Sequence, residues 1–257
     1  MPALAPLAEF LDAALDIAAI PDYPNAVNGV QLANTGDIQH IATAVDFSTD
    51  TVNGAISAGA RLLLVHHGMF WSGVQPIVGA RRQRLHTLLL HDVAVYSAHL
   101  PLDVHRTLGN NALLARRLGL EPSTGFAKYQ AIDVGLSGIS DIPTRVLAAR
   151  AQELASEHRG TLVATPFNAD RITRRWGVCT GAGADSSTLR EASERGLDTL
   201  IVGEGPHHTA VEARELGIVI LYAGHYATET LGVRALGEAL ATNFGLTSTF
   251  VDAPTGL

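Results

Sequence analysis

The two halves of this sequence repeat one order of elements. Residues 55–65, AISAGARLLLV, match residues 192–202, ASERGLDTLIV, and each segment is typical of a helix end closed by glycine and followed by a short strand. Residues 93–103, VAVYSAHLPLD, match residues 219–229, VILYAGHYATE, in which an apolar strand precedes a histidine and then a carboxylate. Many proteins repeat a helix–glycine–strand unit, but the matched histidine and carboxylate indicate an internal duplication.

The pattern of apolar residues predicts an α/β fold. A strand at Ile41–Val45, a helix at about Thr49–Ala58 and a strand at Leu62–Val65 follow one another in the first half. Such alternation favours mostly parallel sheets that are buried on both faces. The segment EPSTGFA at residues 121–127 is rich in proline, serine and glycine, so we expect two similar α/β domains, residues 1–125 and 126–257.

Composition excludes several classes of protein. The chain of 257 residues is 47% hydrophobic and 17% charged, which is typical of a globular protein and not of a disordered one. Its formal net charge of −7 argues against general nucleic-acid binding and against binding to anionic membranes. No apolar run is long enough to span a bilayer. A secretory signal begins with positively charged residues, but the first positive side chain of this sequence is that of Arg61. With Cys179 as its one cysteine, the protein is expected in the cytoplasm.

Histidines and carboxylates follow the predicted strands. In parallel α/β sheets, ligands bind at the carboxyl ends of strands. Three predicted strands end in such groups: His66-His67-Gly68, then His99 and Asp103, and finally His225 and Glu229. His99 alone could equally be a hydrogen-bonded core histidine, but its placement matches that of His225 in the other half. The pattern therefore predicts that these side chains gather at one site.

The residue types favour metal binding. Neutral imidazole and carboxylate are ligands of first-row divalent metals such as Zn, Fe, Mn, Co or Ni. Five to six such groups exceed the needs of one tetrahedral zinc ion, so the sequence predicts two divalent ions per chain. A second histidine pair, His207-His208, precedes a predicted helix at Thr209–Leu216, and we do not expect direct metal contact there.

The motifs resemble a known family, the dinuclear-metal-centre hexameric proteins that are called type 2 GTP cyclohydrolase I homologues. The resemblance covers nearly the whole chain, and its most specific segments are LLLVHHGMFWSG at 62–73, the HLPLD motif at 99–103 and AGHYATETLGVRAL at 223–236. It departs from the family in PNAVNGVQL at 24–32, which has two extra residues in a loop. At 257 residues the chain resembles the short form, without the inserted domain of longer members.

The resemblance also implies a site and an assembly. Carried over to this sequence, the metal ligands are His66, His67, Asp103, His225 and Glu229, and Glu229 is the expected bridging carboxylate. It implies two metals in a cleft between two similar α/β domains. It further implies self-association into a homohexamer, which the residues alone do not indicate.

The chemistry of two nearby metals favours hydrolysis, because such ions activate water and polarise a carbonyl or phosphoryl oxygen. The resemblance implies GTP cyclohydrolase-like activity on a nucleotide or another phosphorylated small molecule. Two alternatives stay open: a non-catalytic metal-binding or metal-delivery protein, and an assembly scaffold with structural metals. A proton carrier beside the metals would favour an enzyme, and the candidates are His99, Glu204 and His207.

Phosphate recognition has weaker signals. Arg81, Arg82 and Arg84 lie between the metal motifs and could neutralise a phosphate, but a solvated basic face or a subunit contact would have the same pattern. The glycine pair in Gly181-Ala182-Gly183 is more typical of a tight strand-to-helix turn than of nucleotide binding.

Overall fold

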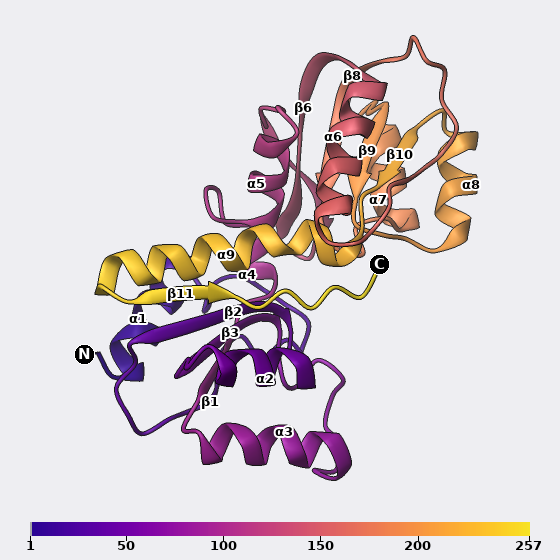
Figure 1. Ribbon diagram of the computed structural model, residues 1–257. Coiled ribbons are helices and arrows are strands. Elements are labelled where there is room, and N and C mark those ends of the chain that lie inside the picture. The colour runs from indigo at the N-terminus through magenta and orange to yellow at the C-terminus, as the bar shows by residue number, and fades with distance from the viewer. Residues whose placement is uncertain (1) are drawn as a thin grey trace. The chain divides into compact units, whose positions relative to one another are not determined.

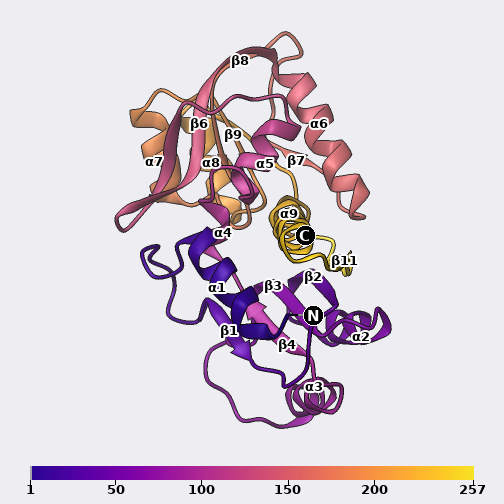
Figure 2. The ribbon, with the colours of Figure 1, turned by 90° about the vertical axis from the view of Figure 1, so that its left-hand side faces the viewer.

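The computed structural model describes residues 2–257 (Figures 1 and 2). The chain forms two compact units. Unit 1 contains residues 2–102 and 232–253, and unit 2 contains residues 103–231 and 254–257. These bounds differ from a division at residues 125 and 126, because the C-terminal segment returns to the sheet of unit 1. The sequence pattern gave no sign of this return, since helix periodicity does not reveal which sheet a helix covers.

Unit 1 is built on a five-stranded sheet. Its strands are β1 (Gly29–Leu32), β2 (His40–Asp46), β3 (Leu62–His67), β4 (Ala94–Ser97) and β11 (Thr247–Phe250), and its order is β1-β4-β3-β2-β11. All neighbouring strands are parallel except β1, which pairs antiparallel with β4. The helices are α1 (Leu4–Leu15), α2 (Thr49–Ser57), α3 (Gly79–Leu90) and the C-terminal part of α9 (His225–Phe244).

Alternating side chains explain how helices cover both faces of this sheet. Ala42 and Ala44 of β2 pack in one apolar cluster with Val52 of α2 and Leu88 of α3. On the opposite face, Thr43 lies close to Gly237 of α9. Figure 1 shows α2 and α3 on one side of the sheet and α9 on the other. Since every residue of β3 is buried, the chain can place strand-end side chains in a dry environment.

Unit 2 is built on a six-stranded sheet of order β5-β6-β8-β9-β10-β7. The strands are β5 (Thr124–Tyr129), β6 (Ile132–Pro143), β7 (Val163–Ala164), β8 (Ile172–Cys179), β9 (Thr199–Val202) and β10 (Val219–Tyr222). The helices are α5 (Asn110–Arg117), α6 (Thr144–Glu157), α7 (Ser186–Glu194) and α8 (His207–Glu215). Alternate residues of β9 again face two layers: Ile201 packs with α5 and α6, and Leu200 packs with α7 and α8 (Figure 2).

The α/β class with two similar units is confirmed, and the topology shows what is repeated. In unit 1, β2, β3 and β4 run parallel, and an antiparallel strand, β1, borders β4. In unit 2, β8, β9 and β10 run parallel, and an antiparallel strand, β7, borders β10. The sheet of unit 2 is nevertheless mixed: among the described residues, three of its five strand pairings are antiparallel. The added β5–β6 pair causes this difference from a mostly parallel sheet.

In both halves of the repeat, a helix begins within three residues of the end of equivalent strands. The one-turn helix α4 (Leu100–Asp103) follows β4, and α9 follows β10. His99 directly precedes α4, and His225 is the first residue of α9. Across residues 2–257, no helix combines the length and the apolar character needed to cross a membrane.

Candidate metal centre

Three histidines of unit 1 form a buried cluster. His66 and His67 are the last two residues of β3, and His99 lies two residues beyond the end of β4. Because β3 and β4 are parallel neighbours, their carboxyl ends meet at the same edge of the sheet. One ring nitrogen from each histidine lies within 4.8 Å of those of the other two, and the three residues are at most 7% exposed. The fold therefore brings together His99 and the predicted pair.

Each of these imidazoles is oriented through its Nδ1 atom. The Nδ1 of His66 lies 2.8 Å from the carbonyl oxygen of Ala98, which can accept but not donate. The Nδ1 atoms of His67 and His99 lie 2.8 Å from carboxylate oxygens of Asp46 and Asp22. An acceptor at Nδ1 assigns the proton to that nitrogen and places the lone pair on Nε2. Histidines that bind metals are held in this way.

Asp22 is fixed more firmly than a surface carboxylate would be. Its second oxygen accepts hydrogen bonds from the backbone N–H of Leu100 at 2.9 Å and from the side chain of Asn28 at 2.8 Å. Burial alone would raise the pKa of Asp22, but the hydrogen bond and charge of His99 and the bond from Asn28 lower it below its ordinary value. Asp22 therefore stays a carboxylate and holds the ring of His99.

The sequence interpretation missed Asp22 and Asp46. Asp46 is the last residue of β2, so it lies at the same strand edge as the end of β3. That position was a usable signal, because the strand at Ile41–Val45 was predicted and Asp46 follows it directly. Asp22 lies in a loop between α1 and β1, where no periodicity marks it. Only the folded chain shows that it contacts His99.

In unit 2, His225 and Glu229 share one face of α9. They are four residues apart, and the Nε2 of His225 lies 3.2 Å from Oε2 of Glu229. The Nδ1 of His225 lies 2.8 Å from Oε1 of Glu204, which follows the end of β9. Burial lowers the pKa of His225, but the hydrogen bonds and charges of Glu229 and Glu204 outweigh it and raise the pKa to about 9. Glu204 thus acts on His225 as Asp22 does on His99.

Asp103 is the other buried carboxylate of unit 2, at 5% exposure. Its Oδ1 accepts a hydrogen bond of 2.8 Å from Asn110 and one of 3.4 Å from the hydroxyl of Thr180. Burial raises the pKa of the Cys179 thiol, and the charges of Asp103 and Glu229 raise it further. Both effects favour the neutral thiol form of Cys179.

Gly181 makes room for Glu229. A Cβ atom at position 181 would lie 2.1 Å from Oε1 of Glu229. The residue has a φ of 61°, and its N–H donates a hydrogen bond of 3.1 Å to the hydroxyl of Thr228. The sequence predicted a tight turn at Gly181-Ala182-Gly183. The backbone of this turn approaches the carboxylate of Glu229 closely.

The remaining candidates have different positions. His207 and His208 are exposed at the start of α8. His207 lines a pocket of about 350 Å³ that Glu204 and Tyr222 also line. Of the three arginines, Arg82 is exposed, whereas Arg81 and Arg84 line a separate cavity beside His67.

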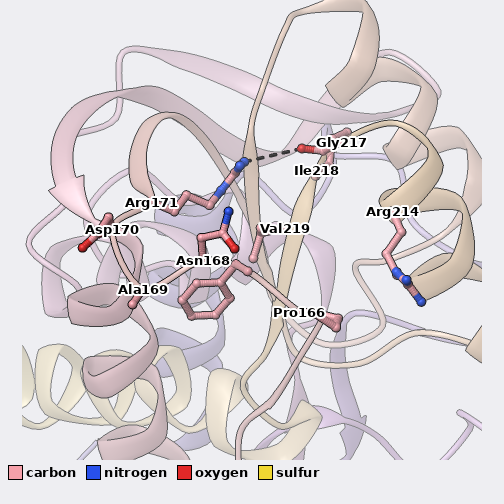
Figure 3. A pocket seen from close by; sticks show the side chains of 10 residues that line it. Pro166, Asn168, Ala169, Asp170, Arg171, Arg214, Gly217, Ile218 and Val219 are labelled. Carbon is pink, nitrogen blue, oxygen red and sulfur yellow. Dashed lines mark hydrogen bonds between the residues drawn. The ribbon is translucent and has the colours of Figure 1, made fainter.

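A pocket of about 910 Å³ lies at the edge of the unit 2 sheet where the parallel strands begin, opposite the edge at which they end (Figure 3). It contains Val219, the first residue of β10, and Arg171, which directly precedes β8. Figure 3 shows the guanidinium of Arg171 pointing toward the carbonyl oxygen of Gly217, 3.4 Å away. Amino ends of parallel strands rarely carry the ligand site of such a sheet, and Asp170 is the one acidic residue of this lining. The carboxyl ends of the strands are therefore the stronger candidate site.

The donor set in each unit fits a divalent first-row metal. Unit 1 supplies three imidazoles, and unit 2 supplies an imidazole and two buried acidic side chains. Such nitrogen and oxygen donors suit Zn, Fe, Mn, Co or Ni. The contacts between the histidine Nδ1 atoms and oxygen acceptors are those expected of histidines that bind a metal ion through Nε2.

Comparison with known proteins places this chain in a family. Residues 3–255 match Duf34/NIF3 (NGG1p interacting factor 3). The chain belongs to the Duf34/NIF3 family. The Duf34/NIF3 relatives called "GTP cyclohydrolase 1 type 2 homolog" include a protein of Deinococcus radiodurans, 38% identical over 98% of this chain and 93% of the relative. Another, from Pyrococcus abyssi, is 39% identical over 98% of both chains. A solved structure described as protein ybgI, of unknown function, has a TM-score of 0.86 at 35% identity and covers 98% of this chain and 99% of that one. The expected family is thus confirmed.

Proposed function

We propose that this protein is a metal-dependent hydrolase with a dinuclear centre. The proposed ligands are His66 and His67 from unit 1 and Asp103, His225 and Glu229 from unit 2, with Glu229 as the bridging carboxylate. The chain supports a shared centre, because it passes from unit 1 to unit 2 within α4, between His99 and Asp103. It returns within α9, just after Glu229.

One observation carries the proposal: four histidines have their Nδ1 atoms 2.8 Å from an oxygen acceptor. A core histidine needs one such contact, and it can be made with either nitrogen. Here the same nitrogen is used each time, which in a neutral ring places the lone pair on Nε2; the Nε2 of His225 also lies 3.2 Å from Oε2 of Glu229, its proposed neighbour in the ligand set. Carboxylates make three of these contacts, and a carboxylate partner increases the basicity of a metal-binding imidazole.

Two divalent ions held by these residues would lower the pKa of a water molecule and polarise an oxygen of the substrate. The residues of this chain would perform the remaining tasks. His99 has its ring fixed by Asp22 and lies in the cluster with His66 and His67, so it is the best placed of the expected proton carriers. Glu204 orients His225, and the exposed His207 is a weaker candidate because it is not among the grouped histidines and carboxylates that could hold a metal.

The proposed substrate is a nucleotide or another phosphorylated small molecule. The name shared by the relatives makes GTP the first compound to test. We further propose that the protein works as a homohexamer, as its resemblance to the family implies, and in the cytoplasm, as its single cysteine favours.

The test combines metal analysis with activity. Protein purified without chelator should contain two divalent ions per chain, and it should hydrolyse at least one member of a nucleotide and phosphoester panel. Glu229→Gln removes a charge and one acceptor oxygen while keeping the shape of the side chain. The variant should lose at least one ion and most activity, whereas His208→Gln, at an exposed position on α8, should lose neither.

Each other outcome points to an alternative. Two ions that stay bound in Glu229→Gln with unchanged affinity would contradict the ligand assignment. Loss of the ions with activity retained would make the metals structural, as in a scaffold. Bound ions with no activity on any substrate, together with transfer to an acceptor chelator, would favour metal delivery.

A further inference from the structure

A small cavity in unit 1 borders the histidine cluster. Its volume is about 260 Å³, and it lies between the end of β2, the loop after β3 and the first turns of α3. The polar and aromatic side chains that line it are those of Asp46, His67, Trp71, Gln75, Arg81 and Arg84. Drug-sized ligands occupy pockets of about 300–1,000 Å³. This cavity therefore suits one chemical group of a ligand, not a whole nucleotide.

Arg81 and Arg84 project into the cavity together because they are three residues apart on α3. Arg81 is anchored: its Nη2 donates to the carbonyl oxygens of Met69 at 2.9 Å and Gly73 at 3.3 Å. These bonds hold the loop after β3 against α3 and fix the guanidinium at the cavity wall.

Arg84 has fewer partners within the chain. Its guanidinium carbon lies 5.4 Å from the centre of the Phe47 ring, and its Nη1 lies 3.4 Å from the hydroxyl of Thr49. Its Nε is buried and has no hydrogen-bond partner among residues 2–257. Over the same residues, neither Arg81 nor Arg84 has a carboxylate within ion-pair distance. A guanidinium offers five N–H donors, so most of those on Arg84 have no protein acceptor.

The charges of the lining favour an anion. Two guanidinium groups face one carboxylate, Asp46, whose Oδ1 already accepts the Nδ1 proton of His67. We infer that the cavity is an anion subsite in which Arg81 and Arg84 bind a phosphoryl group. Guanidinium groups match the oxygens of a phosphoryl group in geometry as well as charge.

The position of the subsite relative to the histidine cluster indicates how a substrate would lie. His67 and Trp71 belong to its lining, and the ring centroids of Trp71 and His99 are 4.4 Å apart. A phosphoryl group in the cavity would thus sit beside His67, a proposed metal ligand, and Trp71 would separate it from His99, the proposed proton carrier. On the proposed hydrolase function, on which this step rests, the subsite holds the phosphoryl end of the substrate while the scissile bond lies at the metals.

The experiment measures phosphate binding to the full-length protein after metals are removed with chelator. Trp71 lines the cavity and is 37% exposed, whereas Trp176, the other tryptophan, is fully buried in unit 2. Inorganic phosphate should therefore change the fluorescence of Trp71 in a saturable way. Arg84→Gln should weaken binding about 10- to 100-fold, as expected for a lost charge-assisted hydrogen bond. Arg82→Gln, on the same helix but exposed, should not weaken it.

Two further arms identify the ligand chemistry and guard against misfolding. Acetate should bind at least about tenfold more weakly than phosphate, because it offers fewer acceptor oxygens to the two guanidinium groups. Arg84→Lys keeps the charge but not the fork of donors, so its affinity should lie between those of the wild type and Arg84→Gln.

Equal weakening by Arg82→Gln and Arg84→Gln would overturn the inference, because it would show a diffuse effect of charge. The absence of saturable phosphate binding in a folded, metal-free protein would overturn it as well. Neither result concerns the metal centre, whose occupancy is measured separately. Conversely, phosphate binding that depends on Arg84 would stand even if the protein proved not to be a hydrolase.

Discussion

Replacing Gly181 by alanine should damage the metal centre more than the fold. The added Cβ would lie 2.1 Å from Oε1 of Glu229, and real Cβ contacts essentially never fall below 3.0 Å. The carboxylate must therefore move by about 0.9 Å, while metal sites tolerate ligand errors of about 0.2 Å. The backbone cannot yield easily, since the carbonyl oxygen of Gly181 accepts a hydrogen bond of 2.8 Å from the N–H of Glu204. The positive φ adds a strain of about 1–2 kcal/mol.

Gly217 supplies the matched control in the same unit. Its φ of 72° resembles that of Gly181, but a Cβ there would meet no atom within 4 Å. Both alanine variants should therefore lose about 1–2 kcal/mol of unfolding free energy in chelator, measured by chemical denaturation. By elemental analysis, Gly181→Ala should lose at least one ion, whereas Gly217→Ala should keep its ions. If Gly181→Ala held its ions as tightly as Gly217→Ala, the role assigned to Glu229 would be refuted.

Three other outcomes are expected. Asp22→Asn should reduce a measured hydrolysis rate about 10- to 100-fold with ion content unchanged, because it loosens the ring of His99; an unchanged rate would exclude His99 as proton carrier. The pKa of His225 is raised to about 9, from an ordinary value of 6.5. The stability that this residue contributes is complete below pH 6.5, and metal-free protein should lose about 3 kcal/mol as pH rises through 9, an effect absent from His225→Gln. Light scattering at micromolar concentration should give the mass of six chains, and a monomer would contradict the hexamer.

Much of the fold could be predicted because both halves of the sequence repeat the same pattern of strands and of polar residues at the strand ends. The predicted strand Ile41–Val45 and helix at about Thr49–Ala58 lie within one residue of β2 (His40–Asp46) and α2 (Thr49–Ser57). The carboxyl-end rule also brought His66, His67 and His99 to one edge, because β3 and β4 are parallel neighbours. These successes depend on local patterns and on one topological rule.

What could not be predicted depends on contacts between distant parts of the chain. Strand β11 pairs with β2, whose residues lie about two hundred positions earlier in the sequence. The residues of this strand, TSTF, do not indicate which strand it pairs with. Asp22 contacts His99 across 77 residues for the same reason. Arg82 could not be separated from Arg84 by sequence, since only the packing of α3 decides which arginines line the cavity.

The charges around the proposed ligands of unit 2 favour a cation. Glu229 and Asp103 are at most 5% exposed, and the burial of an acidic side chain is costly unless its partners offset the charge. Glu229 and Glu204 raise the pKa of His225 to about 9, and the proton that the ring then holds offsets one of their two negative charges. A divalent ion at the Nε2 of His225 would replace one proton by two positive charges. On the proposed function, the contacts that hold the imidazolium would also hold a metal, and the stability of unit 2 would then depend on metal supply.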